Sequence, residues 1–459
     1  MRTAAWYGDL PLDLAFPKDW DVTFHWPKTP PPLSDEKISS ILDRPVGQPP
    51  IAELCRDKTR PLIIVDDLNR PTPAARVIPF LLRSFRKSGI SSEQVRILVA
   101  SGTHAPSPMS AVSRKVGVEA AASCRIILHD CKRDNVKIGR TSYGTPVFAN
   151  HEVVTSDFVL GIGGVYPNHT AGFGGGSKLA LGILGFQSIL HLHYGHSGKG
   201  WGGSGKNYFR NELNEIAEMI SLKTLISVHV NHRREPVGIR CGDYRVFYAE
   251  AAAFSSEAYS APAPENEDVV ISNAYPEDLS LTFAWMKGME PLRRCARGAS
   301  RIVIASCSEG TGHHGLFPFV NAPRFRRVQT GARSLYALGP RRFLRKAAAA
   351  LRSRVKARFN KSGTALHSSA QNQRVPENPF WLYRPGSHAA LFPSQIRGIQ
   401  VKDSWEDIVQ AVRGEQPGKK RLKVAVYPCA PLQCLLSPAR TEEIVSSCEG
   451  ERVLEASQV

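Results

Sequence analysis

The 459-residue sequence lacks several features that would assign it to a familiar class. No apolar run reaches the length of about 20 residues that a membrane-spanning helix needs. The nine cysteines include no C-x-x-C pair, which argues against structural zinc or a disulfide framework and predicts a reducing, cytoplasmic compartment. Residues 1–16 contain Asp9 and Asp13 and no continuous apolar core, so we expect no signal peptide.

Two nucleotide-binding motifs are also absent from the glycine-rich stretch HTAGFGGGSK (169–178). A P-loop ends in Gly-Lys-Ser/Thr, whereas here Ser177 precedes Lys178 and Leu179 follows it. The dinucleotide fingerprint G-x-G-x-x-G fails because Ser177 takes the place of its third glycine. Residues without a Cβ atom can still approach a ligand closely and turn their N–H groups toward an anion. We therefore predict an anion-binding loop that serves neither ATP nor NAD.

Acidic residues are missing between Glu309 and Glu377, although the chain as a whole carries 59 basic and 41 acidic residues, a net charge of +18. Thirteen lysines and arginines fall within a basic block at 324–361. Such a block can bind nucleic acid or an anionic membrane surface. A solvated helix with a loop insertion explains it as well. Because neither stacking aromatics nor zinc-finger spacing accompanies the block, we do not expect nucleic acid as a partner.

Short apolar runs that end in polar residues recur along the first half of the chain. They lie at 59–70, 95–104, 125–131 and 157–165, with a helical pattern at 75–89. A second series has strand patterns at 268–276, 301–312 and 423–428 and a helical pattern at 279–298. Strands that alternate with helices indicate parallel sheets, with functional loops at their carboxyl edges.

The fold class predicted from this alternation is α/β: two α/β domains with mainly parallel sheets and an active site in the cleft between them. We place the N-terminal domain, which carries the glycine-rich stretch, at 1–262 and the C-terminal domain at 263–459. A basic insertion at about 324–375 interrupts the second domain.

Polar residues at the ends of the predicted strands are candidates for chemistry because parallel strands end at one edge of a sheet. Asp67 and Arg70 follow the first strand, and His104 follows the second in a Gly-Thr-His turn that favours it as a base. His193 belongs to the run ILHLHYGH, which is either an incidental histidine-rich helix end or a source of a metal ligand. Lys287 reads equally well as an ordinary surface lysine.

Several of these pieces together resemble the nickel-dependent lactate racemase family over most of the chain outside the basic insertion. They are Asp67-x-x-Arg70-Pro71, Gly102-Thr103-His104-x-Pro106, Ala171-Gly172-Phe173-x-Gly175-Gly176-x-Lys178, His193, Asn231, Gly242-Asp243 and Lys287-Gly288. The ordered set is specific, whereas any single piece would be a weak signal.

The resemblance implies a 2-hydroxy acid substrate and a cofactor, the nickel pincer nucleotide (pyridinium-3-thioamide-5-thiocarboxylic acid mononucleotide). By position, Lys178 resembles its covalent tether and His193 its nickel ligand. The cofactor would carry the hydride step while His104 and His169 act as acid/base groups. Asp67 and the glycines would contact the cofactor, and the charges of Arg70 and Lys287 suit anionic substrate groups. The glycines implied in cofactor binding are Gly174, Gly175 and Gly176.

The sequence also departs from the family pattern. Pro167-Asn168-His169-Thr170 places the second histidine one position closer to Lys178, so either His169 or Asn168 takes the position of the second base. Near Lys287, Ala284 or a neighbour replaces a glutamine that the family uses for the substrate carboxylate. We therefore expect a larger or sugar-derived 2-hydroxy acid rather than lactate. The alternative is a non-catalytic homologue that binds an anionic ligand, with the basic block contacting a polyanion or a membrane surface.

Overall fold

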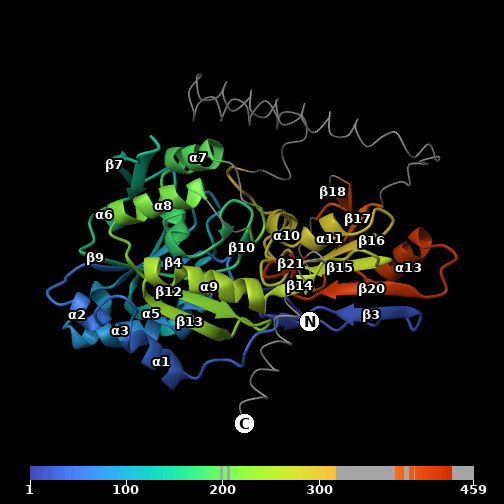
Figure 1. Ribbon diagram of the computed structural model, residues 1–459, viewed down its shortest axis with the longest axis horizontal. Coiled ribbons are helices and arrows are strands. Elements are labelled where there is room, and N and C mark those ends of the chain that lie inside the picture. Colours follow the sequence, from blue (N-terminus) through green and yellow to red (C-terminus); the bar gives the residue numbers. More distant parts are fainter. Residues whose placement is uncertain (197–199, 204–206, 317–377, 387–391, 397, 437–459) are drawn as a thin grey trace, which may run out of the picture.

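The computed structural model describes residues 1–196, 200–203, 207–316, 378–386, 392–396 and 398–436. Two sheets of mainly parallel strands lie side by side, each in its own lobe (Figure 1). The predicted α/β fold class is confirmed. The predicted insertion at 324–375, including the basic block, lies outside the described residues, and the domain boundary at 262/263 stays a prediction.

The first lobe is built on a six-stranded sheet. Its order is β13 (Pro236–Asp243), β12 (Thr224–Val230), β9 (Phe158–Gly164), β4 (Pro61–Asp66), β5 (Arg96–Ala100), β6 (Arg125–Leu128). Neighbours are parallel except β12 and β13. Strand β4 is buried along its whole length because successive side chains enter opposite faces. Ile63 and Val65 pack into one core, and Leu62 and Ile64 into the other.

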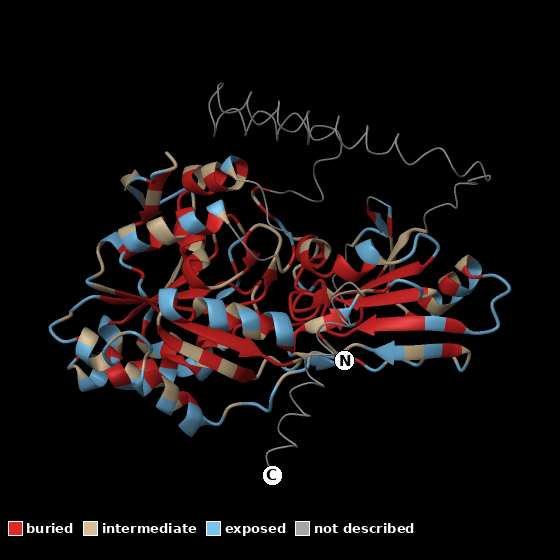
Figure 2. Ribbon diagram, viewed as in Figure 1, coloured by how far each residue is buried: buried red, intermediate tan, exposed pale blue. Residues whose placement is uncertain are grey.

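Helices cover both faces of this sheet, which explains why its strands read as continuous apolar runs (Figure 2). One face packs against α1 (Asp35–Asp43), α2 (Ile51–Leu54), α3 (Ile78–Lys87), α4 (Met109–Val116) and α5 (Val118–Ser123). The other packs against the 3₁₀ helix η3 (Gly176–Ile183) and against α7 (Phe186–Gly195), α8 (Tyr208–Met219) and α9 (Tyr244–Ala258). Helix α3 confirms the predicted helical pattern and buries Ile78, Leu81 and Phe85.

The second lobe is built on a seven-stranded sheet. Its order is β18 (Gln395–Ile396), β19 (Ile399–Lys402), β17 (Phe380–Tyr383), β16 (Ser300–Ile304), β15 (Val269–Asn273), β20 (Leu422–Tyr427), β3 (Trp20–Phe24). All neighbours are parallel except β18 and β19. Strand β3 pairs with β20, so an N-terminal segment completes the sheet of the second lobe.

Helices α10 (Leu281–Lys287), α11 (Glu290–Arg294) and α13 (Trp405–Glu415) belong to this lobe. The single helix predicted at 279–298 is wrong in detail, because α10 ends at Gly288 and Pro291 lies in the first turn of α11. A proline is well tolerated in a first turn but not in a helix interior.

Short elements complete the fold. They are the pairs β1 (Arg2–Thr3) with β2 (Leu10–Pro11), β7 (Asn135–Arg140) with β8 (Pro146–Asn150), β10 (Pro167–Asn168) with β11 (Gly172–Phe173), and β14 (Ser260–Pro262) with β21 (Cys434–Leu436), together with α6 (His151–Val154). Within the described ranges, no helix combines the length and the apolar character needed to cross a membrane. The cysteines in these ranges are free thiols.

Candidate active site

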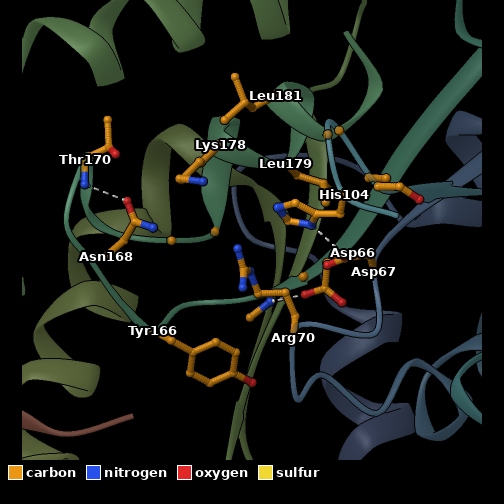
Figure 3. Close-up of a pocket in the computed structure, with 18 of the residues that line it drawn as sticks. Asp66, Asp67, Arg70, His104, Tyr166, Asn168, Thr170, Lys178, Leu179 and Leu181 are labelled. Carbon is orange, nitrogen blue, oxygen red and sulfur yellow. Dashed lines mark hydrogen bonds and ion pairs between the residues drawn. The ribbon is translucent and has the colours of Figure 1, made fainter. Parts of the chain in front are cut away.

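A pocket lies at the carboxyl ends of β4, β5 and β9, where the first lobe faces α10 of the second. Open parallel sheets bind ligands at this edge. Figure 3 shows Arg70, His104 and Lys178 reaching toward one space from three different segments. The predicted site residues that line the pocket are Asp67, Arg70, His104, Gly174, Gly175, Gly176, Lys178, His193 and Lys287.

A buried ion pair supports the floor of the pocket. Lys115 of α4 is fully buried, and its Nζ lies 2.7 Å from Oδ1 of Asp66 at the end of β4. The same Nζ donates to the main-chain carbonyls of Asp67 and Arg70 at 2.8 and 3.0 Å. Asp66 also accepts hydrogen bonds from the Thr72 hydroxyl and from N–H of Gly164 in β9. The loop that carries Asp67 and Arg70 is therefore fixed from several sides.

Asp67 and His104 form a hydrogen-bonded pair inside the pocket. Nδ1 of His104 lies 2.7 Å from Oδ2 of Asp67, which also accepts from Asn69 Nδ2 at 2.7 Å. Burial raises the pKa of Asp67, but His104, Arg70 and Asn69 outweigh this effect and hold the pKa well below its usual range. A carboxylate that accepts from Nδ1–H leaves the lone pair of the neutral ring on Nε2. His104 can therefore accept a proton at Nε2.

Arg70 and Lys287 bring positive charge from both lobes. Nη1 of Arg70 lies 2.9 Å from Oε2 of Glu277, a buried carboxylate of the second lobe. Lys287 is 6% exposed at the end of α10. Burial lowers its pKa to about 8; Glu277 opposes this shift and Arg70 adds to it. At neutral pH both side chains are charged and suited to a carboxylate or phosphate.

The glycine loop (residues 172–176) bends tightly beside the pocket. Gly175 and Gly176 have φ angles of 66° and 56°, in the left-handed region that favours glycine. A Cβ atom on Gly175 would lie 2.6 Å from Cγ2 of Val165, and one on Gly176 would lie 2.7 Å from Cδ2 of Tyr248. Both positions therefore exclude a side chain on steric and conformational grounds.

Lys178 follows this loop, in η3, and its amine lies among other cations. Burial lowers its pKa well below the usual value, and Arg70, Lys287 and Arg210 lower it further, with Asp67 opposing them. Both effects favour the neutral form of the amine. A neutral lysine amine is a nucleophile, and catalytic lysines are activated in this way.

His193 on α7 lies on the pocket wall. Its Nδ1 bonds to the carbonyl oxygen of Ile189 at 2.9 Å, one helical turn earlier. Burial lowers its pKa to about 4 despite this bond, so the ring is neutral at physiological pH. A neutral imidazole oriented through Nδ1 is the usual form of a metal-ligating histidine. Within the described residues, no three His, Cys, Asp or Glu side chains are grouped closely enough to hold a metal ion by themselves.

Asn168 and His169 differ in their position relative to the pocket. Asn168 lines the pocket, and its Oδ1 accepts from N–H of Thr170 and Ala171 at 3.0 and 2.9 Å. Among the described residues, His169 is not part of the pocket lining; its ring lies 4.6 Å from the ring of Trp201. Burial, followed by Lys287, lowers the pKa of His169 to about 4.

Several pocket residues escaped the sequence prediction. His314 lines the pocket from the second lobe, with its ring centre 4.9 Å from that of His104. Phe283 contacts His104 edge-on, with their ring centres 4.7 Å apart, and also lies next to His314. Two adjacent histidines, His313 and His314, stand in the sequence after a predicted strand, but no sequence pattern distinguishes Phe283, Glu277 or Lys115.

Known proteins agree with this picture. Residues 7–202 match the family described as the lactate racemase N-terminal domain. The lactate racemase of Lactiplantibacillus plantarum is 28% identical over 291 residues, which cover 61% of this chain and 68% of the relative. That of Thermoanaerobacterium thermosaccharolyticum is 28% identical over 295 residues, covering 62% and 69%. The solved lactate racemase apoprotein from T. thermosaccharolyticum superposes with a TM-score of 0.66 at 20% identity, covering 95% of this chain and 99% of that one, which shows a shared fold.

The fold and the pocket thus define a two-lobed α/β protein with a pocket between the lobes, and its relatives are named lactate racemases, which are isomerases that act on hydroxy acids. Over residues 7–202 the chain is similar to the N-terminal domain of lactate racemases.

Proposed function

We propose that this chain racemises or epimerises a 2-hydroxy acid with a nickel pincer nucleotide tethered to Lys178. The observation that carries the proposal is the convergence of three groups on one pocket: the buried amine of Lys178, whose pKa is lowered, the neutral imidazole of His193 and the Asp67-oriented His104. These are the residue types that a covalent tether, a nickel ligand and an acid/base group require.

The shape and charge of the pocket suit such a group. Gly175 and Gly176 line the pocket, and the contacts that Cβ atoms would make there with Val165 and Tyr248 show that the loop is packed tightly against the protein. Consecutive glycines in a left-handed conformation turn N–H groups toward an anion such as a nucleotide phosphate. Lys178 would hold the cofactor covalently and His193 would bind its nickel. When bound, the cofactor supplies the acceptor and donor of the substrate hydride.

The chain's own residues position the substrate and move its proton. Arg70 and Lys287 bind the anionic end of the hydroxy acid, with Arg70 held in place by Glu277. Nε2 of His104 accepts the hydroxyl proton and later returns it, while Asp67 holds Nδ1 and stabilises the charged ring. We assign Asn168, rather than His169, to the position that faces the substrate. Its amide can orient a hydroxyl group but cannot take up a proton.

The substrate we propose is a 2-hydroxy acid other than lactate. Ala284 is fully buried in α10, and its methyl group cannot hydrogen-bond a carboxylate as an amide would. Phe283 adds an aromatic edge beside His104, and Met286 also lines the pocket. This apolar wall suits a side chain larger than the methyl group of lactate.

Intact-protein mass spectrometry and nickel analysis test the proposal directly. The protein is produced together with the enzymes that make the cofactor and is purified natively. We expect a covalent adduct and about one nickel per chain, both lost in Lys178→Met, which keeps the length of the side chain but has no amine to form the tether. Lys137→Met, at an exposed position on β7, is the matched control. Full racemase activity with an unmodified Lys178 would refute the proposal.

The second candidate function is a non-catalytic anion-binding protein. The observation in its favour is that Arg70, Lys178 and Lys287 all line one pocket. It predicts binding of an anionic ligand without nickel and indifference to His193→Ala. Nickel content therefore distinguishes the two functions.

A further inference from the structure

Arg210 lies behind the glycine loop, on the side away from the pocket. It is the third residue of α8, whose first turn is capped by Asn207 through a 3.1 Å bond from N–H of Arg210. Its side chain is buried, and the residue is 9% exposed. Among the described residues, no carboxylate forms an ion pair with its guanidinium.

The guanidinium of Arg210 donates hydrogen bonds to the backbone carbonyls of the glycine loop. Nη1 donates to the carbonyl oxygen of Gly175 at 2.7 Å, and Nη2 donates to that of Phe173 at 2.5 Å. The hydroxyl of Tyr248 donates to the carbonyl of Gly174 at 3.0 Å and accepts from Nη2 of Arg210. Three consecutive carbonyl oxygens are thus held by one guanidinium and one hydroxyl.

These contacts fix the direction of the loop's N–H groups. In a planar trans peptide the N–H points opposite to the carbonyl of the preceding residue. The N–H groups of Gly175 and Gly176 follow the carbonyls of Gly174 and Gly175, so both point away from Arg210. Gly175 and Gly176 line the pocket, and Lys178, which follows after Ser177, lines it too.

We propose that Arg210, completed by Tyr248, is a positioning residue that holds the glycine loop open toward the pocket and thereby presents the amine of Lys178. The inference deepens the proposed function, on which it rests for the identity of the group that Lys178 binds. Arginine is required because its planar fork reaches two carbonyls and one hydroxyl at once, which an ammonium on a flexible stem does not reproduce. Without the fork, the loop carbonyls turn toward the pocket and accept hydrogen bonds from Lys178.

The test uses the full-length protein without cofactor, so it does not depend on nickel chemistry. Lys178 and Lys287 are acetylated with N-acetoxysuccinimide at neutral pH, and peptide mass spectrometry gives the rate at each site. Lys287 is the internal reference because it lines the same pocket from the other lobe. The ratio of the Lys178 rate to the Lys287 rate reports the presentation of Lys178, and a merely general loss of stability would move both rates.

In Arg210→Lys and Arg210→Met we expect this ratio to fall about tenfold or more. The reason is that hydrogen bonds from the Lys178 amine to the loop carbonyls make this amine less available for acetylation. In Tyr248→Phe, which keeps the ring and removes the hydroxyl, we expect a fall of about threefold. Arg245→Lys, at an exposed ion-paired position on α9, should leave the ratio unchanged. A ratio within twofold of the unmutated protein in folded Arg210→Lys overturns the inference. If neither Arg210 variant folds, an unchanged ratio in Tyr248→Phe overturns it.

Discussion

His104 and Asp67 lie on the loops after β5 and β4, yet Nδ1 of His104 is 2.7 Å from the Asp67 carboxylate. This contact decides which ring nitrogen carries the proton. The carboxylate holds the proton on Nδ1, and Nε2 is then the basic atom.

Asp67→Asn tests this orientation. The amide can donate to Nδ1 and so favour the ring form protonated at Nε2, which cannot accept the hydroxyl proton. We expect kcat to fall about 10²–10⁴-fold, the usual contribution of a general base. Asn69→Ala removes a bond to Asp67 but leaves the pair intact, and should cost less than about tenfold. An equal loss in both variants would show that the Asp67–His104 contact is not what matters.

The second proton-transfer group is tested by comparing His104→Gln with His169→Gln. We expect His104→Gln to lose about 10²–10⁴-fold in both directions of racemisation. His169→Gln should keep activity within about tenfold, because its ring packs against Trp201 rather than in the pocket lining described by the structure. Chiral chromatography of the product formed from each pure enantiomer measures the two directions. A loss of about 10²–10⁴-fold in His169→Gln would instead identify His169 as the second base.

The lowered pKa of Lys287 predicts that the substrate binds more weakly at alkaline pH. Its pKa is lowered to about 8, so the charged form is present below this pH and is lost above it. We expect KM for the anionic substrate to rise by up to tenfold for each pH unit above about 8, as the charged fraction falls. In Lys287→Arg the charge persists, and the rise should disappear. A KM that stays flat to pH 10 in the unmutated protein would contradict a role for this charge.

A buried histidine away from the pocket, His229, predicts that the folded protein loses stability in acid. His229 is 2% exposed, its Nε2 lies 2.8 Å from the Ala251 carbonyl, and burial lowers its pKa to about 4. The unfolded chain binds this proton near pH 6.5 and the folded chain only near pH 4, so stability falls as pH drops through this window. The shift corresponds to roughly 3 kcal/mol. Urea unfolding at pH 7 and pH 5 should show a smaller loss in His229→Asn; an identical loss would exclude His229 as a source.

Strands β4, β5 and β9 of the first lobe were predictable because they are buried on both faces and therefore read as continuous apolar runs. Strand β3 was not, because its sequence WDVTF is partly exposed and its partner β20 lies about 400 residues further along the chain. No local pattern encodes such a pairing. The sequence does not indicate the break between α10 and α11, because the apolar periodicity of a helix continues across it.

Some residues of the candidate site were predictable from the sequence, and others were not. Residues at strand ends, such as Asp67 and His104, were predictable because parallel strands share an edge. Lys115 reads as a surface lysine on a helix, and only the packed structure shows it fully buried against Asp66. The choice between Asn168 and His169 depends on orientation, because neighbouring residues of an extended segment point to opposite sides. Their order in the sequence does not determine which one enters the pocket.

The path of the N-terminal segment has a consequence for motion. Within the described residues, the chain passes between the lobes after β3 and again after α9. Before β3, Ala4 and Ala5 donate to Asp278 of the second lobe, while the indole of Trp6 donates to Leu68 of the first. A single connection would let one lobe swivel in any direction. Two connections define an axis, so opening of the cleft becomes rotation about one line, and the groups facing each other across it separate and return in register.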